Sequence, residues 1–270
     1  MTLDLTPTSG LPLTFDLATS ELRWAADVRM DRVVQRRLGE ILPVLQQPDA
    51  DEPDRLLYYM TYNLRFDSEE QALRSMNLRY DVTVLLPGRV GIEPIKTAGH
   101  YHPAEGSSGL AYPEIYTVLA GRAHYLLQRD GAAPGEIAEA VLIEAEAGNK
   151  LLIPPGYGHI SINPGPGPLI MANLVASDFS PDYGPIRQLG GGCYLAEQPE
   201  GAGLPVYRPN PRYGAVPPLR WAHAASLPAQ GLETVVPLYT AFARDPARFQ
   251  YVARPGAEGG PAWTSLSFWS

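Results

Sequence analysis

The sequence predicts an all-β fold of the sandwich or barrel type. Pro and Gly are frequent, at 28 and 26 of 270 residues, which favours short strands and turns over long helices. Seven short apolar runs follow one another between residues 78 and 177, and Gly or Pro lies between each pair of them. Hydrophobic residues make up 45% of the chain, which is enough for a substantial core.

The segments before these runs predict a small amount of additional structure. Residues 1–25 alternate weakly around a turn and predict short strands or loop. Residues 28–47 carry Val33, Val34, Leu38, Ile41 and Leu42 at helical spacing, so we expect the best helix of the chain there. Residues 54–64 predict a strand, and 68–75 predict a short helical turn.

The barrel strands themselves are the seven runs, whose alternate residues would face one interior if the strands close in antiparallel order. After about residue 200 the composition changes. A Pro-rich stretch, 199–221, is expected to wrap the surface in extended form, and 234–252 to hold a short helix. Trp263, Phe268 and Trp269 are expected to cover an apolar surface. The runs are 78–88, 114–121, 122–129, 138–145, 150–156, 159–165 and 169–177.

Charge and cysteine content exclude several classes of protein. The net charge is −8 and the pI is about 5.1, so the chain is a poor candidate for nucleic-acid binding, although one pocket can still be locally positive for a small anion. Cys193 is the only cysteine and allows no intrachain disulfide. The N-terminus lacks the features of a secretory signal, and no stretch approaches 18 apolar residues. We therefore expect a soluble, cytoplasmic protein that does not bind membranes.

Two histidines in the segment GHYHP, residues 99–103, raise the question of a metal site. His100 and His102 alternate as strand neighbours do, so both imidazoles project to the same side. Glu114 begins a neighbouring run and is followed by Gly121. His159 lies in GNKLLIPPGYGHISIN, residues 148–163, just after a Pro-Gly turn.

These spacings resemble the two sequence motifs of the cupin superfamily. The first motif is HxH, then Glu, then Gly after six residues, and the second is filled at Gly148, Pro154, Gly156, His159 and Asn163. The chain departs from the usual form because eleven residues separate His102 from Glu114, and because the usual leading Gly is missing. The gap, 103–113, is expected to be a loop inserted at the opening of the barrel. The resemblance implies a cupin fold, a double-stranded β-helix or jelly-roll barrel with an N-terminal helix and an extended C-terminal tail.

More specific segments resemble the cupin-type, metal-dependent glucose-6-phosphate isomerases of archaea and some bacteria. They are LRYDVTVLLPGRVG, KTAGHYHP, YPEIYTVLAGRAHYLLQ, IPPGYGHISIN and DYG at 182–184. The resemblance divides the chain into N-terminal strands and helix packing on the barrel (1–54), a cupin phosphoglucose isomerase domain (55–213) and a C-terminal extension (214–270).

The resemblance also implies a role for individual residues. The expected metal ligands are His100, His102, Glu114 and His159. Two features depart from the family: Pro181 stands where a His is often found before DYG, and Val175 stands where a Tyr can occur. The substrate site is therefore altered, or completed by the loop 103–113 or by Lys96. The residues expected to bind the sugar phosphate are Tyr58, Thr83, Thr97, Gly99 and Tyr183, and Lys96 is included because it adds a positive charge.

The expected reaction is the interconversion of glucose 6-phosphate and fructose 6-phosphate through a cis-enediol, in glycolysis and gluconeogenesis. Glu114 is expected to be the base and Tyr116 a catalytic neighbour, with a metal-assisted hydride shift as the mechanistic alternative. Three imidazoles and a carboxylate suit a divalent transition metal, Fe²⁺ first, with Mn, Co, Ni, Cu or Zn as alternatives. A homodimer is expected. A cupin Fe²⁺ dioxygenase and a non-catalytic sugar-binding cupin are the rival functions.

The remaining candidate residues are interpreted as structural. His124 and His223 hold no motif position, so we expect them to pack or to lie at the surface. Cys193 has no partner constellation and is expected to be an inert small residue.

Overall fold

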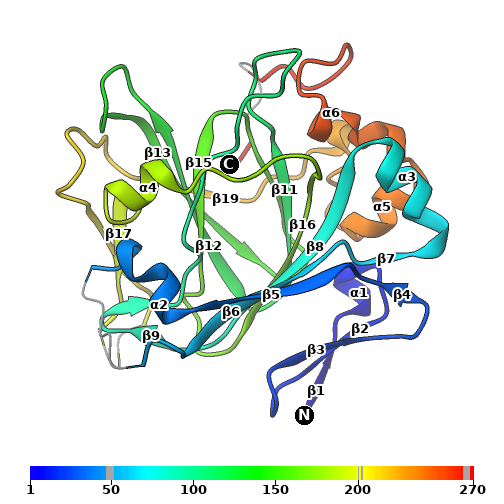
Figure 1. Cartoon of the computed structure of the whole chain (residues 1–270), viewed down its shortest axis with the longest axis horizontal. Coiled ribbons are helices and arrows are strands. Elements are labelled where there is room, and N and C mark those ends of the chain that lie inside the picture. Colours follow the sequence, from blue (N-terminus) through cyan, green and yellow to red (C-terminus); the bar gives the residue numbers. More distant parts are fainter. Residues whose placement is uncertain (47–51, 200, 202, 264–267) are drawn as a thin grey trace.

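Two antiparallel sheets enclose the centre of this computed structural model, which describes residues 1–46, 52–199, 201, 203–263 and 268–270 (Figure 1). Tyr125 on one sheet packs against Tyr116 on the other, with ring centroids 5.3 Å apart, so the inner faces meet in one core. The larger sheet has the order β14-β11-β16-β8-β6-β5, and the smaller one β15-β12-β13-β19. Their strands are β5 (Arg32–Arg37), β6 (Leu56–Tyr62), β8 (Leu78–Leu85), β11 (Glu114–Ala120), β12 (Arg122–Asp130), β13 (Ile137–Glu146), β14 (Lys150–Ile153), β15 (Tyr157–Ile162), β16 (Leu169–Ala176) and β19 (Arg220–His223).

The strand order is that of a jelly roll, which confirms the predicted all-β cupin fold. Strands β8, β16, β11 and β14 are neighbours in one sheet, whereas the intervening β12, β13 and β15 belong to the other. The chain therefore crosses between the sheets repeatedly, as the two Greek keys of a jelly roll require. The segment that holds the two paired histidines runs beside β15, through bridges from Lys96 to Ile162 and from His100 to His159.

Burial explains why the strands differ in their sequence patterns. All eight residues of β16 are buried, because one face looks into the barrel and the other is covered by α6 (Gln250–Ala253). This strand therefore reads as a continuous apolar run, LIMANLVA. Strand β13 instead mixes buried and exposed positions, as expected for a strand with one face toward solvent.

The helix predicted over 28–47 is wrong for most of its length. Val28–Arg29 is a short strand, β4, and Arg32–Arg37 is β5, which pairs with β6 at the edge of the larger sheet. Only Leu38–Ile41 forms an α-helix, α2, which the 3₁₀ turn η1 (Leu42–Val44) follows. Residue 47 lies outside the described residues.

The other predicted elements are confirmed where the structure describes them. Residues 54–64 contain β6, and 68–75 contain α3 (Glu70–Ser75), which follows the 3₁₀ turn η2 (Asp67–Glu69). The N-terminal residues form a three-stranded sheet and a short helix α1 (Thr6–Ser9). The small strands are β1 (Thr2–Asp4), β2 (Leu13–Asp16), β3 (Glu21–Trp24), β7 (Arg65–Phe66), β9 (Arg89–Val90), β10 (Glu93–Pro94), β17 (Tyr194–Glu197) and β18 (Val206–Pro209).

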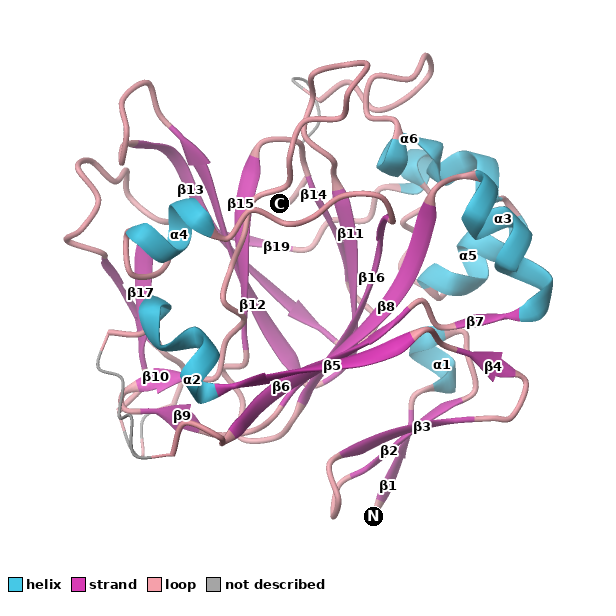
Figure 2. Ribbon diagram, in the orientation of Figure 1, coloured by secondary structure: helices cyan, strands magenta, loops and turns pink. Residues whose placement is uncertain are grey.

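The C-terminal extension packs on the barrel rather than leaving it. Figure 2 shows α5 (Leu238–Arg244) and α6 beside α3, at the outer side of the larger sheet. Tyr239 of α5 meets Tyr80 of β8 edge to face, with ring centroids 5.2 Å apart. The extension also contains β19 and the 3₁₀ turns η3 (Pro228–Gln230) and η4 (Pro246–Phe249), and the predicted extended stretch includes β18 and β19, apart from residues 200 and 202, which are not described.

The terminal aromatic residues cover this chain's own surface. Trp269 is 4% exposed, bridges to Ala224 beside β19 and meets Tyr157 of β15 edge to face. Phe268 is also buried, next to the half-buried Trp263. These side chains therefore pack within this chain and cover an apolar surface of the barrel, as the sequence predicts.

None of the helices in the described part of the chain is both long and apolar enough to cross a membrane.

Candidate metal centre

The four predicted ligands converge at the open end of the barrel. The GHYHP segment pairs with β15 through two backbone hydrogen bonds, from His100 N–H to the His159 carbonyl at 3.2 Å and from His159 N–H to the His100 carbonyl at 3.0 Å. Glu114 is the first residue of β11, in the facing sheet. One ligand atom from each of His100, His102, Glu114 and His159 lies within 4.8 Å of all the others.

The donor atoms point at one another, but only the two imidazoles of the GHYHP segment are paired with each other. Nε2 of His100 lies 3.1 Å from Nε2 of His102, and Oε2 of Glu114 lies 3.1 Å from Nε2 of His159. Despite that short distance, the Glu114 and His159 atoms are not aligned as a hydrogen bond, and both are buried without a partner among the described residues. Buried polar atoms without partners are costly, so the cluster fits an added cation that all four would coordinate.

The inserted loop 103–113 holds His102 in the orientation that a metal ligand needs. Its Nδ1 lies 2.9 Å from the carbonyl oxygen of Tyr112, so Nδ1 donates and Nε2 keeps its lone pair toward the cluster. Phe179 packs on the His102 ring at a centroid distance of 4.5 Å and stacks in turn on Tyr112. The inserted residues between His102 and Glu114 thus help to hold the His102 side chain in place.

The electrostatics of the cluster favour a neutral His100 beside an ionised Glu114. Burial, and then the neighbouring His159 and His102, hold the pKa of His100 well below its ordinary value. Burial raises the pKa of Glu114, but the approach of His102 and His159 lowers it by more, so the Glu114 pKa lies below its ordinary value. These are the protonation states in which His and Glu bind metals.

Two predicted tyrosines contact the cluster, and a third binds the backbone of the segment that carries His100. Tyr116 is buried two residues after Glu114, and its ring meets that of His159 edge to face at 5.8 Å. Burial and the Glu114 carboxylate raise the pKa of Tyr116, so it stays a hydrogen-bond donor. The ring of Tyr183 lies 5.4 Å from that of His100. The hydroxyl of Tyr58 accepts a hydrogen bond from Ala98 N–H at 3.3 Å, and burial raises its pKa.

Gly99 and Thr97 shape the backbone beside these side chains. Gly99 has a φ of +76°, and a Cβ there would stand 2.4 Å from Cγ1 of Ile160, so only glycine fits. Thr97 is tied to β15, because its Oγ1 accepts Ser161 N–H at 3.0 Å. Thr83 is buried on β8, opposite Met171.

The structure does not support Lys96 as a substrate ligand. Its side chain is 4% exposed and its ammonium contacts the carboxylate of Glu93, which is itself 1% exposed. This ion pair lies beneath the surface. It neutralises the positive charge that was expected to bind the phosphate of the substrate. Glu93 precedes Lys96 by only three residues, so the pair itself was readable in the sequence, but its burial was not.

The structural interpretations of the other candidate residues agree with the structure. His124 is fully buried, with Nδ1 2.7 Å from the hydroxyl of Tyr207. His223 is exposed on β19. Cys193 is buried and free, and burial raises the pKa of its thiol to about 12.

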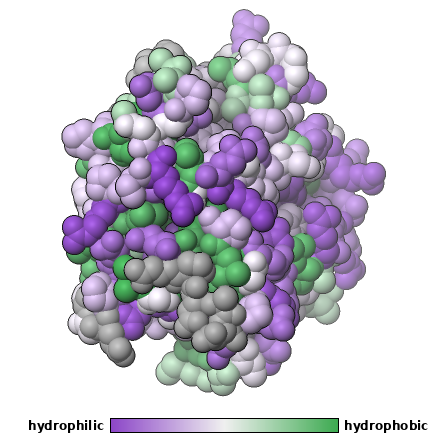
Figure 3. Space-filling model, turned by 60° about the vertical axis from the view of Figure 1, so that its left-hand side comes forward, coloured by the Kyte–Doolittle hydropathy of each residue, from purple (hydrophilic) through white to green (hydrophobic). Residues whose placement is uncertain are grey.

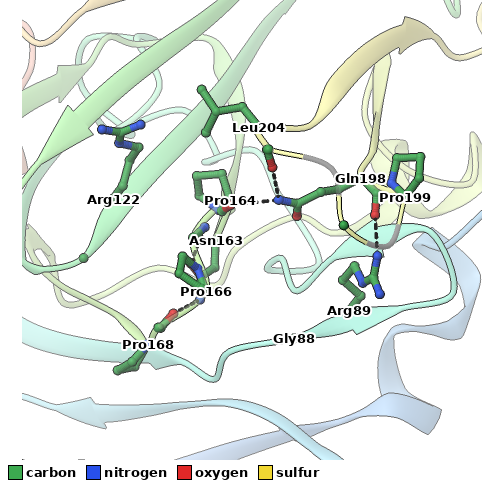
Figure 4. A pocket seen from close by; sticks show the side chains of 15 residues that line it. Gly88, Arg89, Arg122, Asn163, Pro164, Pro166, Pro168, Gln198, Pro199 and Leu204 are labelled. Atoms are coloured by element: carbon green, nitrogen blue, oxygen red, sulfur yellow. Dashed lines mark hydrogen bonds between the residues drawn. The ribbon is translucent and has the colours of Figure 1, made fainter.

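A cavity of about 610 Å³ lies away from this chemistry (Figure 4). It is lined by the turns that follow β11 and β15, whereas Glu114 begins β11. Asn163, the last residue of the second motif, lies here and donates to the carbonyls of Gly167 at 2.9 Å and Leu86 at 3.3 Å. The role of Asn163 is therefore to hold the loops at the far end of the barrel.

A smaller cavity of about 370 Å³ adjoins the metal cluster, and sequence reasoning missed two of the residues that line it. The two missed residues are Arg36 and Arg187. Tyr183, which was expected, also lines this cavity. Arg187 lies four residues after Tyr183, one turn along α4 (Gly184–Gln188). That spacing would have indicated a shared face only if a helix had been predicted after DYG.

Known proteins match the part of the chain that contains this cluster. The family model described as "Glucose-6-phosphate isomerase (GPI)" matches residues 35–212. The glucose-6-phosphate isomerase of Thermococcus litoralis is 35% identical over 144 residues, which are 53% of this chain and 68% of that protein. The enzyme of the same name from Thermococcus gammatolerans is 35% identical over 121 residues, or 45% and 58%.

A more distant bacterial relative, the "putative glucose-6-phosphate isomerase 1" of Rhizobium meliloti, is 33% identical over 118 residues, or 44% of this chain and 50% of that protein. The chain thus spans half to about two thirds of the length of these relatives. Solved structures are similar only at a low level. A Bacillus subtilis oxalate decarboxylase mutant gives a TM-score of 0.33 at 19% identity, over 50% of this chain and 29% of that one, and the coconut allergen cocosin gives 0.31 at 14%, over 54% and 31%.

Proposed function

Because the chain belongs to the glucose-6-phosphate isomerase family, we propose that it interconverts glucose 6-phosphate and fructose 6-phosphate in a metal-dependent reaction. The observation that carries the proposal is the buried cluster of His100, His102, Glu114 and His159, with atoms that lack partners and face one another. Aldose–ketose isomerisation moves one proton between two adjacent carbons and stabilises an enediolate oxygen, which is work for such a site.

The chain's own residues supply the proton transfer. Glu114 is 3% exposed, so its carboxylate acts in a site from which water is largely excluded. We assign it to take the proton from one carbon of C1 and C2 and return it to the other. Tyr116, which burial and the adjacent carboxylate keep protonated, donates a hydrogen bond to the substrate. Tyr183 lies over His100 and closes one side of the site.

His100, His102, Glu114 and His159 would hold a divalent transition metal, which when bound supplies Lewis-acid polarisation of the substrate oxygens. Fe²⁺ is the proposed metal, with Mn, Co, Ni and Zn as alternatives that the same donor set accepts. We further propose a cytoplasmic homodimer that acts in glycolysis and gluconeogenesis. Light scattering is expected to return twice the chain mass of 29.4 kDa, and a monomer at micromolar concentration would contradict the dimer.

The first experiment is a coupled assay with fructose 6-phosphate on chelated and reconstituted protein. Chelation is expected to abolish turnover, and Fe²⁺, Mn²⁺, Co²⁺ or Ni²⁺ is expected to restore it. Full activity of metal-free protein would overturn the metal-dependent reaction. Oxygen consumption in place of isomerisation would identify the dioxygenase alternative, and sugar binding without turnover the non-catalytic one.

The second experiment separates the base from the ligands. Glu114→Gln preserves the side-chain volume and three imidazoles, so metal is expected to bind more weakly while turnover falls by about 10²–10⁴-fold. His100→Ala is the matched comparison, because its loss is expected to be rescued partly by added metal. In heavy water, the wild type is expected to incorporate solvent deuterium at C1 or C2. Retention of the original hydrogen, or a Glu114→Gln enzyme with full metal and near-normal rate, would favour the hydride shift.

A further inference from the structure

The cavity beside the metal cluster has the size and the lining of a binding site for the charged end of a small substrate. Its volume of about 370 Å³ lies in the range of ligand pockets. Ala98, two residues before His100, lines it together with Tyr183, whose ring packs on that of His100. The opposite wall is formed by α2 and η1, which lie beside α4 (Figure 1). The cavity is therefore continuous with the surroundings of a metal ligand.

The first cation of this cavity is Arg187. It follows Tyr183 by one turn of α4, and its N–H donates to the Tyr183 carbonyl at 3.0 Å, so both side chains leave the same face. Arg187 is exposed, and its guanidinium has neither a hydrogen bond nor an ion pair with any residue that the structure describes. Figure 3 shows hydrophilic side chains mixed with apolar ones on this side of the molecule, rather than an apolar surface.

The second cation, Arg36, comes from β5 and is only loosely held. It lies directly opposite Tyr58 of β6, so both side chains project from the same face of the sheet. Its Nη1 is 3.5 Å from Oε1 of Glu40, a long and partly exposed contact. The other oxygen of Glu40 accepts Arg37 N–H at 2.7 Å, which fixes the carboxylate at the start of α2. Two cations and one anion thus line the cavity, and the local charge is positive.

Other cations near the metal ligands are already neutralised. Lys96 is paired with Glu93 beneath the surface. Arg79 is held by Asp81 at 2.7 Å and by the Ala176 carbonyl at 3.0 Å, and its side chain is 17% exposed. A phosphate group needs cations whose donors are free, because charge-assisted hydrogen bonds carry most of its binding.

We propose that Arg36 and Arg187 hold the phosphate group of the substrate in this cavity, while Glu40 weakens that binding by occupying Arg36. The proposal rests on the proposed function, because it places the phosphate of a sugar phosphate whose other end lies at the metal cluster. It assigns to this chain two binding residues that neither cupin motif contains.

The test measures fructose 6-phosphate kinetics and inorganic phosphate binding on the metal-loaded full chain. Arg187→Gln is expected to raise KM, and to weaken phosphate binding by calorimetry, by roughly 10-fold, with kcat changed little. Arg36→Gln is expected to act in the same direction. Glu40→Gln retains a capping oxygen but removes the competing charge, and is expected to lower KM by about two- to five-fold.

Arg122→Gln is the matched control, since Arg122 pairs with Glu146 at the opposite cavity and is expected to leave KM unchanged. An active wild type whose KM is unaffected by Arg187→Gln and Arg36→Gln would overturn the phosphate site. An equal rise of KM in Arg122→Gln would also overturn it. Phosphate binding that every variant retains would place the phosphate at the metal and would overturn it as well. A wild type without isomerase activity that still binds phosphate through Arg187 would refute the proposed function and support the site.

Discussion

Replacing Gly99 with alanine is expected to destabilise the protein by about 2–5 kcal/mol, the sum of two costs that the structure separates. The backbone φ of +76° costs a residue with a side chain about 1–2 kcal/mol. The new Cβ would also stand 2.4 Å from Cγ1 of Ile160 and 3.1 Å from Cδ1 of Ile186, both buried. Overpacking of this kind costs about 1–3 kcal/mol.

Alanine variants of two other glycines allow the backbone cost and the packing cost to be measured separately by thermal or urea unfolding. Gly148 has a φ of +90° with nothing within 4 Å of a Cβ, so Gly148→Ala is expected to lose only about 1–2 kcal/mol. Gly106 has neither constraint, and Gly106→Ala is expected to stay within about 0.5 kcal/mol of the wild type. At about 2–4 °C per kcal/mol, Tm should fall by roughly 4–20 °C for Gly99→Ala and 2–8 °C for Gly148→Ala. Equal losses for those two variants would refute the packing argument.

The remaining predictions concern buried titratable groups. Lys96→Met leaves Glu93 buried without its cation, so unfolding free energy should fall by about 3–5 kcal/mol while the KM of the folded enzyme is unchanged; a raised KM would return Lys96 to the substrate site. Burial lowers the pKa of His124 to about 4, below its ordinary value of 6.5, so the unfolded chain binds the extra proton between these pH values. Stability should therefore be intact above about pH 6.5 and fall by up to about 3 kcal/mol as pH drops toward 4. His124→Gln should lessen that pH dependence in denaturant titrations, and an unchanged slope would contradict the assignment.

The barrel was predictable from sequence because turn residues separate its strands. The first six apolar runs from residue 78 onward are each followed within three residues by Gly or Pro, and these residues lie at or just beyond the observed strand ends. The sheet order was not contained in the runs themselves. It followed from the spacing of the two histidine motifs, which resembles a family with a known fold.

The failure at 28–47 shows where local pattern is insufficient. Val33, Val34, Leu38 and Ile41 satisfy a helical spacing, but Arg32, Val34 and Arg36 also alternate as one face of a strand. Pairing with β6 decides between the two, because it adds a strand to the larger sheet and satisfies the backbone of both. That information lies in residues 56–62, beyond any window used to recognise a helix.

The cluster of His100, His102, Glu114 and His159 was predictable and the contacts that support it were not, for a related reason. Its members occur in compact segments, so their residue types and spacing are readable in sequence. The carbonyl of Tyr112 that orients His102 belongs to an insertion, and Phe179, which packs on the same ring, comes from beyond β16. Such contacts depend on where the fold brings a loop, and the sequence of the loop alone does not indicate it.

The charge distribution explains how an acidic chain can favour an anionic substrate. A net charge of −8 repels anions at long range, but the Debye length at physiological salt is about 8 Å, so a bound phosphate responds mainly to its immediate neighbours. In the cavity beside His100 those neighbours are Arg36, Arg187 and Glu40, and the balance there is positive. The buried pairs Lys96–Glu93 and Arg79–Asp81 add little net charge, because each is neutral as a unit. Selectivity for a phosphorylated sugar therefore depends on which few cations the fold leaves unpaired, and the total charge of the sequence does not reveal it.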